Sequence, residues 1–209
     1  MKKIVICNIP MRDDTEECVY KSDDKALPTS DKAVVYPICA YFEKALASGD
    51  ELKVLLLAKT GEKSHYEKNI GIFKEELASA IGDREVSVEY KVIATDFSGE
   101  NDVFEELMIR LVDEIDVGSE IFADITYGPK DLPITVFSAL TFAEKRLECE
   151  IEHIIYGKAD FAWVDGKKKP VNTELWDMVA LFYLTNVASS VPAVNPEQAK
   201  RLLKSMFTV

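Results

Sequence analysis

The sequence is poor in the residues from which metal centres and redox sites are built. Its 209 residues include only four cysteines and two histidines. No two cysteines are spaced as C-x-x-C, so neither a zinc ribbon nor a thioredoxin-like motif is expected. The histidines, His65 and His153, lie far apart in the chain, and His153 falls on an expected strand without a second histidine nearby. We therefore predict neither a metal site nor a bound cofactor.

Positive charge is also in short supply. Lysine and arginine number 25 against 37 aspartates and glutamates, which gives a formal net charge of −12 at pH 7. This balance argues against binding of duplex DNA or of an anionic membrane, because both require a basic face. No basic recognition helix is present, which argues against a transcription regulator. A small anionic ligand is still compatible, since charges more than about 8 Å away are largely screened at physiological salt.

Long hydrophobic runs are absent as well. No apolar segment approaches the roughly 20 residues that cross a bilayer. The apolar run after the first two lysines is too short for the core of a secretory signal, so we expect a cytoplasmic, reduced protein. With 47% hydrophobic and 30% charged residues, the composition is that of a globular protein. The length suits one α/β domain with a small appendage.

Apolar segments alternate between strand and helix patterns four times. The expected strands are residues 3–7, 51–58, 86–94, 120–125 and 151–156, and the expected helices between them are residues 38–47, 66–81, 103–115 and 132–147. This order predicts an α/β, Rossmann-like fold with a mostly parallel sheet and helices on both faces. Residues 132–147 are apolar on most sides, so we expect that helix to be deeply buried.

The C-terminal part departs from this alternation. Asp165 and Gly166 separate the apolar residues 161–164 from residues 168–171, which predicts a β-hairpin. Two helices are expected after it, at residues 174–189 and 196–206, the second capped by Asn195. We expect the last helix to pack against its own domain. The predicted organisation is a ligand-binding domain of residues 1–190 and a helical extension of residues 191–209.

Four loops are candidates for a binding site, because ligands of an open parallel sheet bind at the carboxyl ends of its strands. These loops are residues 8–12, 59–61, 95–98 and 126–131. None contains the motifs G-x-G-x-x-G or G-x-x-x-x-G-K-[ST], and no G-x-S-x-G elbow is present. A dinucleotide-dependent oxidoreductase, a P-loop NTPase and an α/β-hydrolase are therefore disfavoured.

The fourth of these loops carries the most chemistry. Gly128 permits backbone conformations that other residues resist. The helix that follows begins with free N–H groups and a partial positive charge, which suit a phosphate. Lys130 adds a full positive charge, and Thr126 and Tyr127 add hydroxyl groups. On local chemistry alone, an ordinary βα turn with a solvated lysine is the simpler interpretation, and an anion site is the alternative.

The sequence of this loop, Asp-Ile-Thr-Tyr-Gly-Pro-Lys-Asp-Leu-Pro, resembles the Asp-x-Thr-His-Gly-Phe-Arg-x-x-Pro signature of the CRISPR-associated Rossmann fold (CARF) proteins. Tyr127, Pro129 and Lys130 stand where that signature has histidine, an aromatic residue and arginine. Other segments resemble the family in the same order along the chain, so that the likeness spans residues 1–190. They are the first strand with its long polar loop, residues 35–37, the strand end at 154–157, and residues 171–186.

The resemblance implies a protein of type III CRISPR antiviral defence that binds cyclic oligoadenylate, a ring-shaped second messenger, with cyclic tetra-adenylate as the expected ring. It also implies a homodimer with the ring across the two-fold axis, an arrangement that suits a symmetric ligand. Arg12 and Lys130 would offset phosphate charge, and Asn8 would contact a ribose or a base. The ligand-binding residues carried over in this way are Asn8, Ile9, Pro10, Met11, Arg12, Thr126, Tyr127, Gly128 and Lys130.

Two activities are compatible with such a pocket. A standalone ring nuclease needs no metal, because a ribose 2′-hydroxyl attacks the adjacent phosphorus and leaves a 2′,3′-cyclic phosphate. Lys130 would stabilise the developing charge, and Thr126 or Tyr127 would position the ring. The alternative is a non-catalytic sensor whose effector is a missing C-terminal part or a separate partner. A flavodoxin-like nucleotide-binding protein with no CRISPR role is a third interpretation.

Overall fold

The described part of the chain forms a sheet of six strands in the order β3-β2-β1-β4-β5-β6. The computed structural model describes residues 2–96, 101–164, 166–192 and 195–207, so that Phe97 and Ser98 of the third candidate loop and Asp165 of the predicted turn lie outside the described residues. The first five strands are parallel and β6 is antiparallel to β5. The strands are β1 Lys2–Asn8, β2 Glu51–Lys59, β3 Ser87–Thr95, β4 Glu120–Asp124, β5 Glu150–Val164 and β6 Lys167–Asp177.

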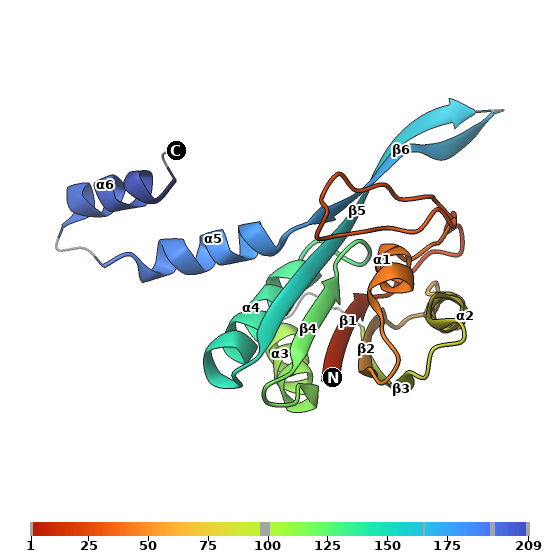
Figure 1. Ribbon diagram of the computed structural model, residues 1–209, viewed down its shortest axis with the longest axis horizontal. Helices are drawn as coiled ribbons and strands as arrows, with labels where there is room; N and C mark the ends of the chain where they lie inside the picture. Colours follow the sequence, from red (N-terminus) through yellow and green to blue (C-terminus); the bar gives the residue numbers. More distant parts are fainter. Residues whose placement is uncertain (1, 97–100, 165, 193–194, 208–209) are drawn as a thin grey trace.

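Helices cover both faces of this sheet (Figure 1). Phe42 and Phe73 pack with one face, and Leu111 and Leu140 pack with the other, so two separate apolar cores flank the strands. The predicted α/β, Rossmann-like fold with a mostly parallel sheet is therefore confirmed. The described helices are α1 Pro37–Ala45, α2 Tyr66–Ile81, α3 Asn101–Glu114, α4 Leu132–Arg146, α5 Val179–Ser190 and α6 Pro196–Phe207.

β1 lies at the centre of the sheet and serves both cores. Val5 and Cys7 point into the core beneath α1 and α2, whereas Ile4 and Ile6 point into the core beneath α3 and α4. All four side chains are fully buried, as expected for a parallel strand covered on both faces. β1 pairs with β2 on one side and with β4 on the other. The strand order therefore reverses between β1 and β4, which is where such sheets bind ligands.

The hairpin is longer than its sequence indicates. β5 continues without a break from Glu150 through Val164, so the predicted strand 151–156 and the first hairpin arm are one strand. β6 also extends to Asp177, so the helix predicted from residue 174 begins instead at Val179. Leu175 is paired with Gly157 and buried in the core. Cross-strand pairing and burial thus override the helical pattern of residues 174–177.

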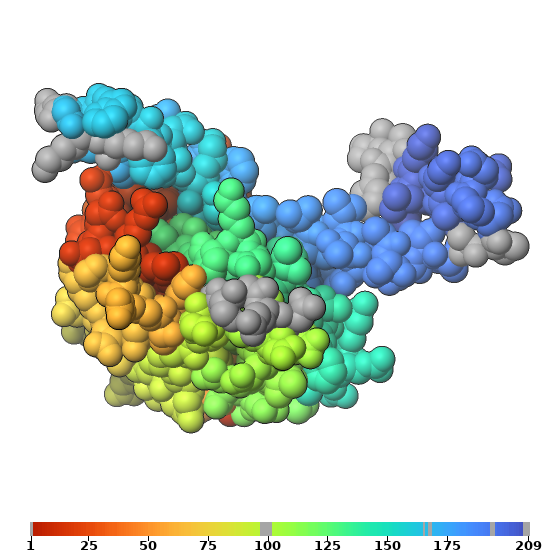
Figure 2. Space-filling view, turned by 180° about the vertical axis from the view of Figure 1, so that it is seen from behind, coloured from red at the N-terminus to blue at the C-terminus, as the bar shows by residue number. Residues whose placement is uncertain are grey.

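Two predictions for the helices are wrong. α4 buries only one face, because Ile134 is 70% exposed and Phe142 is 40% exposed. α6 does not pack against the body of the protein. It lies beyond the end of α5, apart from the sheet and the helices that cover it, in both views (Figures 1 and 2). The predicted cap of α6 is confirmed, since Asn195 Oδ1 accepts a hydrogen bond from the N–H of Gln198 at 2.9 Å.

Candidate functional site

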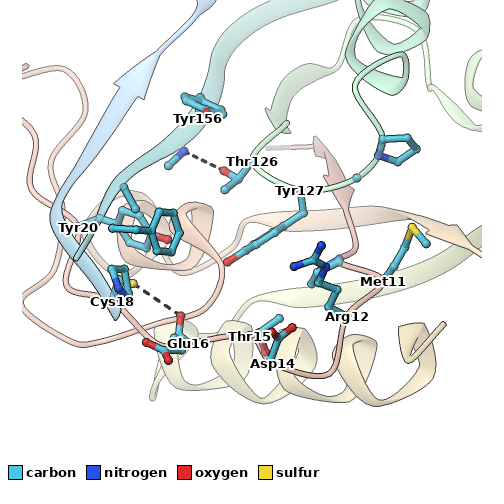
Figure 3. A pocket seen from close by; sticks show the side chains of 17 residues that line it. Met11, Arg12, Asp14, Thr15, Glu16, Cys18, Tyr20, Thr126, Tyr127 and Tyr156 are labelled. Carbon is cyan, nitrogen blue, oxygen red and sulfur yellow. Dashed lines mark hydrogen bonds between the residues drawn. The ribbon is translucent and has the colours of Figure 1, made fainter. Parts of the chain in front are cut away.

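A cavity of about 700 Å³ opens at the carboxyl ends of β1 and β4. Its volume is within the range of small-molecule sites. Three segments line it: the loop after β1, the loop after β4, and the β5–β6 hairpin (Figure 3). The lining residues are Pro10, Met11, Arg12, Asp14, Thr15, Glu16, Cys18, Tyr20, Thr126, Tyr127, Gly128, Pro129, Tyr156, Gly157, Ala159, Phe161 and Pro170.

The structure brings most of the predicted site residues together. Those on the cavity wall are Pro10, Met11, Arg12, Thr126, Tyr127 and Gly128. Asn8 and Ile9 are buried in the body of the protein, and Lys130 is exposed outside the lining. The candidate loop at residues 59–61 and the described part of the third loop do not contribute to this wall.

Asn8 ends β1 directly beneath the fourth loop. Its side chain is fully buried, and neither Oδ1 nor Nδ2 has a hydrogen-bond partner among the described residues. Gly128 lies above it with a φ of +96°, and a Cβ there would be 3.0 Å from Cδ2 of Leu132 and 3.6 Å from Cβ of Asn8. The positive φ favours glycine at this position, and a side chain here would also press against Leu132. An unpartnered buried amide is costly to the folded state.

Asp124 ends β4 and joins the fourth loop to α1. Its Oδ1 accepts a hydrogen bond from the N–H of Thr126 at 3.0 Å, and its Oδ2 accepts one from the N–H of Ile38 at 3.2 Å. Burial raises the pKa of this carboxyl group, and the hydrogen bonds from Thr126 and Ile38 oppose that rise. Asp124 therefore has a positioning role, since both oxygens are engaged by the loop and the first turn of α1.

The hydroxyl groups of the fourth loop are also engaged by the fold. Thr126 Oγ1 accepts a hydrogen bond from the N–H of Gly157 at 2.8 Å. The phenol of Tyr127 donates to the carbonyl of Val35 at 2.9 Å. Burial raises the pKa of Tyr127, so its phenol stays protonated at neutral pH and is not available as a base. These contacts hold the loop to the hairpin and to the segment before α1.

Asn69 of α2 and His65, the residue before this helix, form hydrogen bonds to the first loop. Asn69 Nδ2 donates to the carbonyl of Pro10 at 2.7 Å and to that of Arg12 at 2.8 Å. The N–H of His65 donates to the carbonyl of Met11 at 2.9 Å. Sequence reasoning missed Asn69, although an asparagine on the apolar side of an amphipathic helix, next to Ile70, is a recognisable signal. The loop's conformation thus depends on the side chain of Asn69.

Glu76 of α2 fixes the entrance to α1. Its Oε1 accepts a hydrogen bond from the N–H of Val35 at 2.6 Å, and its Oε2 accepts one from the N–H of Tyr36 at 3.0 Å. Burial raises the pKa of Glu76 to about 7, while these two hydrogen bonds lower it. The carbonyl of Val35 also accepts the hydrogen bond from Tyr127. Glu76 and the fourth loop therefore both hydrogen-bond to the segment just before α1.

The described part of the cavity wall carries a small net negative charge. Arg12 is the one lysine or arginine among the described lining residues, and Asp14 and Glu16 oppose it. The N–H groups of Gly128 and Lys130 make no hydrogen bond to any described residue, and the first turn of α4 follows them. An anion at this edge would therefore meet Arg12 and backbone donors rather than a cluster of cations.

Several lining residues were not predicted from the sequence. They lie on the later part of the first loop, at Asp14, Thr15, Glu16, Cys18 and Tyr20, and on the hairpin, at Tyr156, Gly157, Ala159, Phe161 and Pro170. The sequence carried a signal for the hairpin strand, although not for its place on the cavity wall. Phe161 and Trp163 alternate with smaller residues immediately after the fifth strand, a pattern that a continuous strand would produce.

Within the part of the chain that the structure describes, no group of three or more His, Cys, Asp and Glu side chains is arranged to hold a metal ion. His153 instead pairs with Asp177, with 2.6 Å between Nδ1 and Oδ2. No described helix has the length and apolarity needed to cross a bilayer. Neither a protein-family model nor a curated protein sequence matches the chain.

Proposed function

We propose that this protein is a receptor for cyclic oligoadenylate, with cyclic tetra-adenylate as the expected ring, bound in the cavity between the loops after β1 and β4. The observation that carries the proposal is the meeting of two predicted segments. The loop at residues 10–12 and the CARF-like loop at residues 126–128, distant in sequence, form one wall at the point where the strand order reverses.

The polar groups at this wall suit a phosphodiester ligand. Arg12 supplies a full positive charge, and the N–H groups of Gly128 and Lys130 supply backbone donors. Asn8 is fully buried and is not part of the cavity lining, so we assign it no contact with the ligand. A cation beside backbone donors favours a ligand that carries phosphate.

A homodimer is part of the proposal. A ring with rotational symmetry is best matched by two copies related by a two-fold axis. α4 and α5 offer apolar surface for such an interface, with Ile134, Phe142, Leu181 and Leu184 each at least 40% exposed. The two helices pack together through Phe137 and Phe182. Light scattering should give twice the chain mass of 23.5 kDa; a monomer mass in the presence of the ring would contradict the dimer.

The arrangement of the hydroxyl groups favours a receptor over a ring nuclease. Thr126 and Tyr127, the residues expected to position the ring for cleavage, use their hydroxyl groups to hold the loop. Lys130, the expected stabiliser of developing charge, is exposed outside the lining. A receptor would act through an effector, supplied by a further part of the protein or by a partner. The proposal includes a cytoplasmic location and no binding of duplex DNA.

The test is incubation of the purified protein with cyclic tri-, tetra- and hexa-adenylate in EDTA, with calorimetry for binding and mass spectrometry for products. Binding of intact ring supports the receptor. Linear products that end in a 2′,3′-cyclic phosphate would make the protein a ring nuclease instead. Absence of binding to all three rings would refute the proposal, and a yellow preparation with flavin absorbance would favour a flavodoxin-like protein.

A further inference from the structure

The β5–β6 hairpin carries two strongly exposed aromatic side chains. Phe161 is 58% exposed and Trp163 is 77% exposed. Phe161 lines the cavity together with Pro170, its cross-strand partner. The hairpin extends past the body of the protein (Figure 1). The cavity wall therefore continues onto a projecting arm that is rich in aromatic surface.

Trp163 lies on the same face of the hairpin as Phe161. The pairing of the two strands is regular from Asp160 opposite Val171 to Val164 opposite Lys167. Side chains two residues apart on a regular strand point to the same face. Trp163 is therefore displaced from Phe161 by about 7 Å along β5, on the side that faces the cavity.

The charges at the cavity do not by themselves explain tight binding of a nucleotide, so aromatic stacking could add to the affinity. Arg12 is opposed by Asp14 and Glu16 on the same wall, so charge attraction alone is a weak source of affinity for a ligand with several phosphates. Flat aromatic rings bind nucleobases by stacking, and this contact tolerates any base. A tryptophan that is 77% exposed adds little to the folded core. Base stacking would give the exposed ring of Trp163 a function.

We propose that Phe161 and Trp163 form a base-stacking platform that extends the cavity along the hairpin. The ligand class that this platform requires is a nucleotide with unpaired bases. The inference rests on the proposed function, in which the bases are the adenines of the ring. Backbone donors and Arg12 hold phosphates at the edge of the sheet, while the hairpin holds bases.

The fluorescence of Trp163 tests this inference. The chain has two tryptophans, and Trp176 lies outside the cavity lining, with its Nε1 hydrogen-bonded to Glu174 and the ammonium group of Lys158 5.0 Å from its ring. In a W176F background Trp163 is the sole reporter. Titration with cyclic tetra-adenylate should quench its emission at the same concentrations at which calorimetry detects binding. Inorganic polyphosphate, which has charge and no bases, should leave the emission unchanged.

Substitutions separate the hairpin from the rest of the site. W163A should bind the ring about tenfold more weakly, a difference of about 1.4 kcal/mol, whereas the control W176A should bind as the wild type does. Two results together would overturn the platform: W163A binds the ring with wild-type affinity, and the ring does not quench Trp163 in the W176F protein. The proposed function would then still stand. Loss of the dimer mass in W163A without loss of affinity would make the hairpin a self-association surface and would also overturn it. Absence of ring binding to the wild type would refute both proposals.

Discussion

Gly157 of β5 lies against Pro37, the first residue of α1, so closely that a Cβ on Gly157 would be 2.4 Å from Cγ of Pro37. The same Cβ would be 2.9 Å from Cε1 of Tyr20 on the first loop. The N–H of Gly157 also donates to Thr126 of the fourth loop. Four segments thus meet at one glycine of the cavity wall, and the absence of a side chain is what allows them to meet.

G157A should therefore destabilise the protein. The added methyl group must displace Pro37 or Tyr20, and such overpacking typically costs about 1–3 kcal/mol. Denaturant unfolding should show a lower midpoint for G157A. G71A is the matched control, because Gly71 lies within α2 and a Cβ there meets nothing within 4 Å. It should be as stable as the wild type or more stable, since alanine favours a helix. A G157A protein of wild-type stability would show that the contact is not tight.

N69A should weaken both the fold and the site. It removes the donors that hold the carbonyls of Pro10 and Arg12, and unpartnered buried groups cost about 1–3 kcal/mol. The expected result is a lower free energy of unfolding together with weaker binding of cyclic tetra-adenylate. The control is N195A, which removes the cap of α6, apart from the sheet (Figure 1), and should leave affinity unchanged. Equal affinities for N69A and wild type would remove Asn69 from the support of the site.

Glu76 should make stability depend on pH. Burial raises its pKa to about 7, so between pH 4.5 and 7 the folded protein retains a proton that the unfolded chain has released. The contribution to stability is fully present below pH 4.5 and is lost as the pH rises through about 7. The E76Q protein cannot titrate at this position. The free energy of unfolding of the wild type, relative to E76Q, should therefore fall between pH 5 and pH 8. A constant difference would mean that the pKa of Glu76 is not raised.

The sequence was sufficient for elements whose pattern is local. Tyr66–Ile81 was predicted at its observed bounds because apolar residues recur at helical spacing and Gly82 follows. The buried run of β1 was recognised because it is apolar on both faces. Residues 174–177 were predicted wrongly, because their strand conformation comes from pairing with β5. That pairing depends on residues far away in the chain, which a local pattern does not contain.

Some site residues could likewise be predicted from the local pattern, whereas others could not. Arg12 and Thr126 could be predicted, since they follow strands whose ends meet at the ligand-binding edge of a parallel sheet. Phe161 could not, because its place on the wall depends on how far the hairpin extends and where it lies. Nor could the exposed position of Lys130, which is set by the turn between Gly128 and α4. Positions set by tertiary contacts, rather than by order along the chain, account for what was missed.

The balance of charge on the cavity wall gives a last prediction. R12A removes the one cationic side chain among the described residues of the lining and should lower affinity for cyclic tetra-adenylate by about 1.5–3 kcal/mol, the range for hydrogen bonds to charged groups. K130A should cost less, because Lys130 lies outside the lining and its charge is screened. E16Q should strengthen binding, since it removes a carboxylate that repels phosphate.

Calorimetry at 50 and 200 mM salt distinguishes charge from shape in these variants. The wild-type affinity should fall as salt is added, and the R12A affinity should fall less steeply, because one phosphate contact fewer is screened. T15A is the control, since Thr15 lies on the same wall without charge and should keep the wild-type salt dependence. If R12A kept the wild-type dependence and E16Q bound more weakly, the phosphates would not lie between Arg12 and Glu16, and the ring would have to be placed elsewhere along the wall.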